Sequence, residues 1–177
     1  IKPAFSELVD SVEEFNLTEP LHHLNVVTPS HLANMERVKR KQQSGPARGF
    51  VYEFMLMDWI EGDHLGEFLG RRLPPARTTQ IGSEILDGLT FLHGQNQPII
   101  HRDVKLENIL IEKESETVKI IDFNVSTNAL EDISILGTPG YKAPEVIGQQ
   151  PWTTAADIWS TGVCLVELLA DRRLADP

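Results

Sequence analysis

The amino-acid sequence predicts a fold of the α+β class, in which short strands are combined with longer helices. Apolar residues recur at helical spacing within residues 5–15 and 74–93. Short apolar runs of strand length occur at residues 49–57, 109–111 and 118–121. Because both kinds of segment are present, the chain is predicted to be neither all-helical nor all-β.

Length and composition restrict the class of protein. The chain has 177 residues, which fits one domain, and its 41% hydrophobic content is enough for a packed core. A formal net charge of −10 argues against nucleic acid as a partner. We expect no membrane partner, because no apolar run approaches the roughly 20 residues that cross a bilayer and no signal peptide opens the sequence.

Two further features bear on the setting of the chain. Cys164 is its one cysteine, so an intrachain disulfide is excluded and a reducing, intracellular and cytoplasmic setting is expected. The sequence begins with Ile1 and not with methionine, which suggests an excised or incomplete chain.

The first part of the chain is predicted to hold a helix and two strands. Residues 5–15 place apolar side chains on one face and acids on the other, and Pro20 should end this helix because its ring cannot continue the hydrogen-bond ladder. Residues 36–48 are polar, basic and rich in turn-forming residues, which indicates a loop between two strands. We favour a solvated hairpin tip for this loop over a docking site for an acidic partner.

The later helices are predicted from two different patterns. Pro74 and Pro75 start a helix with one apolar stripe. In residues 153–169, Thr154 lies three residues before Asp157, which is typical of a helix start. Apolar residues surround this second helix on nearly all sides, so we expect it to be buried. The stripe of the earlier helix consists of Ile81, Ile85, Leu89 and Leu92.

The residues that carry chemistry are concentrated in residues 101–108, His-Arg-Asp-Val-Lys-Leu-Glu-Asn. This stretch lies between the apolar pair Ile99-Ile100 and the apolar run 109–111, so we expect two short strands flanking a loop that presents side chains. Fourteen residues after Asn108, the sequence Asp122-Phe123-Asn124 follows another apolar run. Taken singly, most of these residues would be solvated loop charges or turn formers.

The order and spacing of these two stretches resemble the catalytic loop and the metal-binding turn of the protein kinases. The resemblance implies that Asp103 accepts the proton of a substrate hydroxyl and that Lys105 offsets charge near the transferred phosphoryl group. It implies that Asn108 and Asp122 hold the Mg²⁺ ions that bridge the phosphates of ATP. The resemblance also assigns structural roles, among them binding of the catalytic-loop backbone by the aspartate, to His101, Phe123, Glu145 and Asp157.

Residues 137–145, Gly-Thr-Pro-Gly-Tyr-Lys-Ala-Pro-Glu, resemble the segment of the protein kinases that receives the substrate. Thr138 and Lys105 are typical of serine/threonine kinases, in which this threonine bonds to the catalytic aspartate and to the lysine. The implied substrate is therefore a protein with a serine or threonine acceptor. Ser134 occupies a position that is commonly phosphorylated in the family, with Arg102 as the partner of the phosphate. An unmodified loop serine is the alternative.

Residues 49–62 resemble the strand and hinge that bind the adenine of ATP in this family. On that resemblance, Met57 guards the back of the adenine pocket. Asp58 and Ile60 offer backbone groups to the adenine edge, and Asp63 reaches the ribose. An ordinary strand that ends in a glycine turn is the alternative.

Residues 21–27 resemble the link that follows the family's glutamate-bearing helix. Counting back from Leu24 selects Glu14 as this glutamate, with Glu13 as the rival. In the family it pairs with a lysine that grips the α- and β-phosphates. Lys2 is the one lysine upstream, but its spacing from Glu14 is unusually short.

The resemblance divides the chain into a partial N-terminal lobe at residues 1–57, a hinge at 58–62 and a partial C-terminal lobe at 63–177. The implied fold is a protein kinase-like one, with a partial small β-sheet lobe, a mainly α-helical lobe and ATP between them. The implied function is that of a serine/threonine protein kinase catalytic domain that is expected to be incomplete at both ends, since the sequence lacks a glycine-rich phosphate loop and stops at Pro177, before the family's later helices. A kinase-like module that binds partners without transferring phosphate is the alternative.

Overall fold

The structure is a computed structural model that describes residues 15–38, 49–123, 126 and 136–174. These residues form two compact units. The first unit comprises the described residues up to Leu21 together with Thr28–Asp58, and the second comprises His22–Val27 together with the described residues from Trp59 onward. The lobe boundaries proposed from the sequence stay a prediction.

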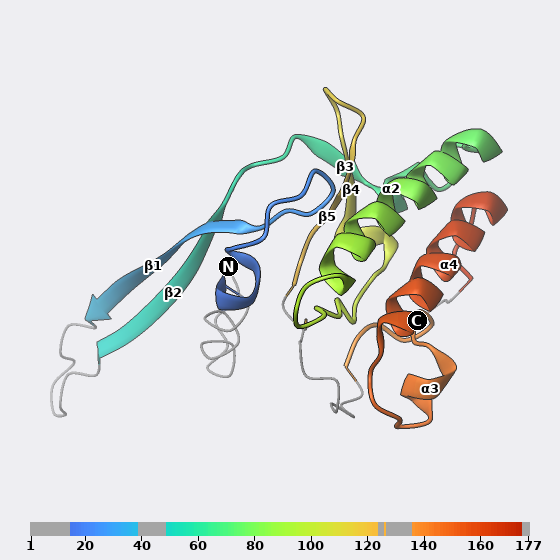
Figure 1. The fold of residues 1–177 in the computed structure, drawn as a ribbon. Helices are drawn as coiled ribbons and strands as arrows, with labels where there is room; N and C mark the ends of the chain where they lie inside the picture. The colour runs from blue at the N-terminus through green and yellow to red at the C-terminus, as the bar shows by residue number, and fades with distance from the viewer. Residues whose placement is uncertain (1–14, 39–48, 124–125, 127–135, 175–177) are drawn as a thin grey trace, which may run out of the picture. The chain divides into compact units, whose positions relative to one another are not determined.

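The first unit is built on a hairpin of two antiparallel strands, β1 (Pro29–Val38) and β2 (Gly49–Met57) (Figure 1). The register sets Met57 opposite Pro29, with an irregularity at the start of β1. Strand β2 confirms the strand predicted for the same residues. The basic loop predicted at residues 36–48 starts too early, because residues 36–38 are still paired in β1, and its remaining residues 39–48 lie outside the described residues.

A helical segment precedes this hairpin. Residues 15–18 are helical, and the helix ends two residues before Pro20, as expected from the missing backbone N–H of proline. The rest of the helix predicted for residues 5–15, Glu14 included, lies outside the described residues.

The second unit contains a three-stranded antiparallel sheet in the order β3 (Gly62–His64), β4 (Ile109–Glu112) and β5 (Val118–Ile120). Strands β4 and β5 confirm two of the strands predicted from apolar runs. Asn25 extends the sheet at its β5 edge, because its carbonyl accepts the N–H of Ile120 at 2.8 Å. The short elements of this unit are η1 (Leu65–Phe68), η2 (Leu106–Asn108) and α3 (Pro144–Ile147).

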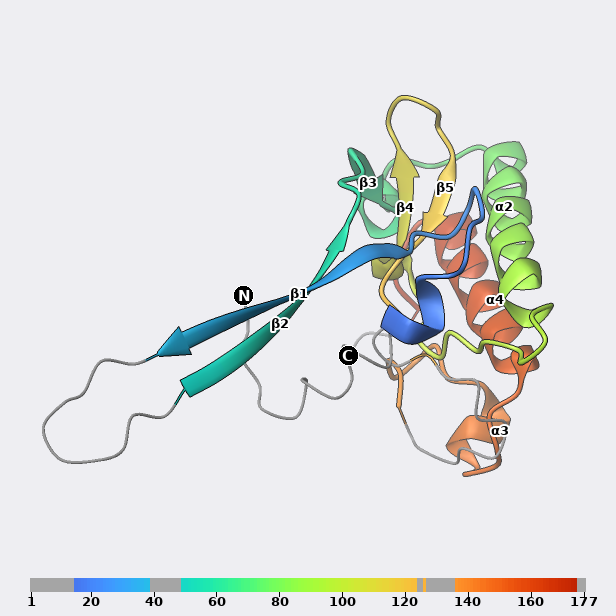
Figure 2. The ribbon, with the colours of Figure 1, turned by 60° about the vertical axis from the view of Figure 1, so that its left-hand side comes forward.

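Helix α2 (Pro75–His93) supplies much of the core of this unit. It starts at a proline whose missing N–H is not needed in the first helical turn. Figures 1 and 2 both show α2 lying along helix α4 (Thr154–Ala170) and beside the sheet. The predicted apolar stripe is confirmed, because no part of its side chains is exposed: Ile81, Ile85, Leu89 and Leu92.

Helix α4 starts at Thr154, which confirms the predicted helix start. No side-chain capping bond is made at this end, because the preceding Thr153 makes none. The Asp157 carboxylate is not part of a capping pair, because it binds the backbone of another segment. The expectation of burial on nearly all sides is wrong within the part of the chain that the structure describes, where neighbours cover one face only. The opposite face exposes 45–58% of Ile158, Trp159, Val166 and Leu169.

The expected strand at Ile99-Ile100 is also wrong. Both residues are buried, but they form only an isolated bridge at Ile100. Ile99 donates its N–H back to the carbonyl of Leu92 at 3.1 Å, and the N–H groups of His101 and Arg102, which follow this pair, bond to the Asp157 side chain instead of a neighbouring strand. Burial of this apolar pair is therefore achieved without a ladder.

None of the helices described in the structure combines the length and the apolar character that a membrane span requires.

Candidate active site

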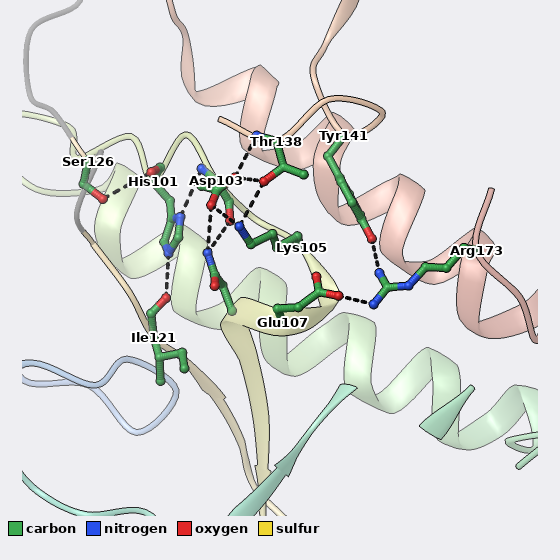
Figure 3. A network of polar contacts seen from close by, with 10 residues as sticks. His101, Asp103, Lys105, Glu107, Ile121, Ser126, Thr138, Tyr141 and Arg173 are labelled. Carbon is green, nitrogen blue, oxygen red and sulfur yellow. Dashed lines mark hydrogen bonds and ion pairs between the residues drawn. The ribbon is translucent and has the colours of Figure 1, made fainter. Parts of the chain in front are cut away.

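Asp103 lies at the centre of a polar network in the loop between α2 and β4 (Figure 3). Its Oδ2 atom accepts a hydrogen bond from Lys105 Nζ at 2.6 Å. The side-chain amide of Asn108 donates to the same Oδ2 at 3.1 Å and to the Asp103 carbonyl at 2.9 Å. The side chain of Asp103 is 14% exposed, so it is mostly buried among these donors.

Thr138 binds the other oxygen of the same carboxylate from a distant segment. Its backbone N–H donates to Asp103 Oδ1 at 2.8 Å, and its hydroxyl donates to that atom at 2.6 Å. The hydroxyl oxygen also accepts from Lys105 Nζ at 2.9 Å. The three side chains therefore form a closed triangle, in the arrangement that the resemblance implied for threonine, aspartate and lysine.

Gly137 allows Thr138 to approach so closely. Its φ angle is +84°, a left-handed conformation that favours glycine, and an added Cβ would lie 2.4 Å from the carbonyl oxygen of Arg102. A larger residue would push the segment away from the loop. The glycine is therefore needed for contact with Asp103 and not only for a turn.

Asp157, on helix α4, binds the backbone at the start of the loop that carries Asp103. Its carboxylate accepts the backbone N–H groups of His101 and Arg102, each at 2.9 Å. A third contact comes from His93, whose Nε2 lies 2.8 Å from Asp157 Oδ2. The aspartate is 1% exposed, so these contacts replace water entirely. Helix α4 thus sets the position of the two residues before Asp103.

His101 connects the loop to the second predicted stretch. Its Nε2 lies 3.1 Å from the carbonyl oxygen of Ile121, and its ring lies 4.9 Å from that of the buried Phe123. Ile121 also donates its N–H to the carbonyl of Asn108 at 3.0 Å. These contacts bring Asp122, whose φ angle is +66°, next to the loop that carries Asn108.

The donor set at Asn108 and Asp122 suits a hard divalent cation. Asn108 is buried and uses its amide hydrogens on Asp103, and its Oδ1 accepts no hydrogen bond from any residue that the structure describes. Amide and carboxylate oxygens are the ligands that Mg²⁺ prefers. The searched residues hold no cluster of three or more histidine, cysteine, aspartate or glutamate side chains. The amide oxygen of Asn108 and the carboxylate of Asp122 are therefore the candidate protein ligands for such an ion.

The residues predicted to face the nucleotide are spread over the two units. Met57 and Asp58 end the first unit, and both side chains are exposed. Ile60 and Asp63 belong to the second unit, where Asp63 lies 3.8 Å from Lys113 Nζ. Their shared contact with adenine and ribose stays a prediction. The predicted contribution of Glu14 lies outside the described residues.

Of the predicted pair of Ser134 and Arg102, in which the arginine binds a phosphate on the serine, the structure describes only the arginine. Arg102 is 8% exposed, has a φ angle of +67°, and places its guanidinium 5.9 Å from the ring centre of Trp152. Ser134 lies outside the described residues, so its pairing with Arg102 stays a prediction. Glu145, at the second position of α3, is half-buried and makes no ion pair with another described residue.

A second polar network was not predicted from the sequence. It joins Tyr141, Glu167, Arg173 and Glu107, of which Figure 3 shows Tyr141, Arg173 and Glu107. Glu167 is wholly buried on α4, and Tyr141 donates to its Oε2 at 2.5 Å. A sequence signal did exist, because a glutamate within an apolar helix must find a partner if it is buried.

Burial and charge shift three pKa values around this network. Burial raises the pKa of the Tyr141 phenol, and the bond to Glu167 raises it further. Burial raises the pKa of the Cys164 thiol as well, so this cysteine stays protonated in the core. Burial lowers the pKa of the Arg173 guanidinium, but Tyr141, Glu107 and Glu167 raise it by more, and the arginine stays charged.

The raised pKa of Tyr141 predicts a loss of stability at alkaline pH. The folded chain holds the phenol proton, whereas the unfolded chain releases it near the usual value of about 10. The stabilisation is therefore fully present below about pH 10 and declines as the pH rises further. The difference in unfolding free energy between the wild type and Tyr141→Phe, measured by urea denaturation, should shrink as the pH rises from about 8 to about 11. Two parallel stability profiles would contradict the burial of this phenol.

Comparison with known proteins agrees with this geometry. The sequence matches the family described as "Protein kinase domain" over residues 5–176. The MAP3K epsilon protein kinase 1 of Brassica napus is 36% identical over 162 residues, which are 89% of this chain and 12% of that protein. Cell division control protein 7 of Schizosaccharomyces pombe is 52% identical over 88 residues, 49% of this chain and 8% of that protein. The serine/threonine-protein kinase sid1 of Schizosaccharomyces pombe is 40% identical over 120 residues, 65% of this chain and 25% of that protein.

The chain thus spans at most a quarter of the length of these three relatives. The family match covers both polar stretches, the segment of Thr138 and helices α2 and α4. The chain belongs to the protein kinase domain family.

Proposed function

We propose that this chain is the catalytic segment of an active serine/threonine protein kinase, which transfers the γ-phosphoryl group of ATP to a serine or threonine hydroxyl of a protein. The observation that carries the proposal is the Asp103 carboxylate, which Lys105, Asn108 and Thr138 hold in one orientation. Protein kinases generally use ATP with Mg²⁺. Relatives named as serine/threonine kinases support the choice of acceptor.

Asp103 takes the role of proton acceptor in this proposal. Phosphoryl transfer needs accurate positioning more than covalent help, and one carboxylate oxygen must receive the proton of the attacking hydroxyl. Thr138 and Asn108 restrict the rotation of the Asp103 side chain from two sides. The carboxylate can then meet the hydroxyl without reorganisation, which is what makes a positioned base effective.

Lys105, Asn108 and Asp122 are proposed to offset the negative charge of the ATP phosphates. Lys105 Nζ lies within hydrogen-bond distance of both Asp103 and Thr138, so it can approach a phosphoryl oxygen next to the base. Asn108 and Asp122 would hold magnesium, which neutralises charge that develops between the β- and γ-phosphates. Met57, Asp58, Ile60, Asp63 and Glu14 are proposed to complete the nucleotide site, by the family resemblance.

Regulation is proposed to act through the segment before Thr138. A phosphate on Ser134 would pair with the guanidinium of Arg102, the residue directly before Asp103. Because the backbone of Arg102 is held by Asp157, such a pair would connect the phosphate to a fixed point. If Ser134→Ala changes neither activity nor protease sensitivity of residues 125–145, this part of the proposal fails.

The full-length protein is expected to label serine or threonine and not tyrosine. The reason is the pair of Lys105 and Thr138, which is typical of serine/threonine kinases and which binds the Asp103 carboxylate here. The measurement is phosphoamino-acid analysis of a mixed protein substrate after incubation with radiolabelled ATP and Mg²⁺. An Asp103→Asn preparation serves as the control for contaminating kinases. A dominant phosphotyrosine signal would overturn the assignment, and no transfer at all would favour a kinase-like binding module.

A further inference from the structure

Arg173 follows the end of helix α4, and its side chain contacts residues of the loop segments near Asp103. The Nη1 atom of Arg173 donates to the Tyr141 hydroxyl at 2.5 Å and lies 3.4 Å from Glu167 Oε2. Its Nη2 atom bonds to Oε1 of Glu107. Figure 3 shows the guanidinium between Tyr141 and Glu107, which belong to separate segments of the chain. One side chain thus bridges three elements.

Two partners of Arg173, Glu107 and Tyr141, each lie close in sequence to a residue that binds Asp103. Glu107 lies within η2, directly before Asn108, whose amide binds Asp103. Tyr141 closes a turn with Thr138, because its N–H donates to the Thr138 carbonyl at 3.3 Å. Two of the three residues that Arg173 contacts, Glu107 and Tyr141, therefore lie in the same short segments as Asn108 and Thr138, which orient the proposed base.

The inner end of the bridge is buried and charged. Glu167 has no exposed surface, and its Oε1 accepts the N–H of Leu174 at 2.9 Å. A buried carboxylate is costly unless it is paired and hydrogen-bonded, and here the arginine and the phenol supply both needs. The outer end is about half-exposed at Glu107, where solvent weakens the attraction. The contact of Arg173 with Glu107 therefore matters more for where it holds η2 than for the strength of its charge attraction.

Gly66 leaves room for this guanidinium. An added Cβ at Gly66 would lie 2.8 Å from Arg173 Nη2 and 3.6 Å from Glu107 Oε1. The glycine sits in η1, so a third element packs against the outer contact. A methyl group there would displace the arginine without altering any charge.

We propose that Arg173 is a positioning residue for phosphoryl transfer, which holds the Thr138–Tyr141 turn and the Glu107–Asn108 segment in register around Asp103. Arg173 acts through these segments and touches none of the reacting atoms. The inference rests on the proposed kinase function but concerns a residue outside the catalytic network. Its planar fork explains why arginine is needed, because one ammonium cannot reach both the Tyr141–Glu167 pair and Glu107.

The test compares Arg173→Met with Arg172→Met in the full-length protein. Arg172 is the adjacent arginine, is exposed, and makes no side-chain hydrogen bond or ion pair with a described residue, so it is a matched control. Arg173→Met is expected to lower kcat about tenfold and to leave the KM for ATP unchanged. The reason is that the Thr138–Tyr141 turn and the Glu107–Asn108 segment orient Asp103 toward the hydroxyl of the protein substrate and do not bind the nucleotide base. Arg172→Met should behave as the wild type. Equal kcat values for the two variants would overturn the proposal.

Two further variants separate positioning from plain structural support. Arg173→Met removes the cation that pairs with Glu167 and should lower the Tm. Arg173→Lys returns a cation to Glu167 and should bring the Tm back to the wild-type value. The lysine cannot also bridge to Glu107, so kcat should stay low. Gly66→Ala should lower kcat by displacing the guanidinium, whereas Gly162→Ala, which meets no atom within 4 Å, should not. If Arg173→Lys restores kcat together with the Tm, Arg173 only neutralises Glu167 and the positioning role is wrong. The same pair of variants decides the matter if Arg173→Met fails to fold.

Hydrogen exchange keeps the inference distinct from the proposed function. Amides of residues 137–143 should exchange faster in Arg173→Met than in Arg172→Met, whether or not the protein transfers phosphate. Unchanged exchange there would refute the bridge. A wild type that transfers no phosphate, yet shows faster exchange in Arg173→Met, would refute the kinase proposal and leave the bridge in place.

Discussion

Asp103→Ala in the full-length protein is expected to reduce phosphoryl transfer by about 100-fold to 10,000-fold, the usual contribution of a positioned general base. The affinity for ATP should be nearly unchanged, because the Asp103 carboxylate contacts Lys105, Asn108 and Thr138 and is assigned to the acceptor hydroxyl. The measurement is the steady-state rate at saturating substrate, combined with a direct binding titration of ATP.

Asp103→Asn is the matched variant for this test. It keeps the size of the side chain and one oxygen that can accept from Thr138, but it cannot take up a proton. Its amide would also face the donors of Lys105 and Asn108. Both variants should therefore be inactive while their thermal unfolding shows a folded domain. Near-wild-type turnover in either would remove Asp103 from the mechanism and, with it, the kinase proposal for this loop.

Asp157→Ala is expected to have the largest effect on stability, a loss of about 3–5 kcal/mol in the free energy of unfolding, as for other broken buried ion contacts. The substitution removes three bonds at once and leaves the buried N–H groups of His101 and Arg102 without an acceptor. The contact with His93 is lost as well. Activity should fall in parallel, because these two N–H groups set the start of the loop that carries Asp103.

Urea denaturation of Asp157→Ala, Asp157→Asn and Asp87→Ala tests this expectation. Asparagine keeps one acceptor oxygen and should lose less stability than alanine. Asp87 is an exposed acid on α2 and makes no side-chain hydrogen bond or ion pair with a described residue, so Asp87→Ala should stay within about 0.5 kcal/mol of the wild type. If Asp157→Ala lies as close to the wild type as Asp87→Ala does, the carboxylate is not the support that its contacts indicate.

The sequence by itself determined the local elements and the identity of the reactive groups. The stripe of α2 is buried as predicted because a helix repeats every 3.6 residues, so spacing alone selects the face that meets the core. The strands at 109–111 and 118–121 followed from apolar runs of strand length. Asp103, Lys105 and Asn108 lie within one loop, so their proximity could be predicted from order and spacing.

The tertiary structure decided what depends on distant partners. Asp157 was predicted both to start a helix and to bind the catalytic loop, and only the fold shows it facing N–H groups 55 and 56 residues away. The pairing of Arg173 with Glu107 spans 66 residues and has no local signature. Helix α4 is apolar nearly all round, yet the described neighbours cover one face of it. Periodicity states how apolar a surface is, whereas the position of neighbouring elements decides which part of that surface is removed from water.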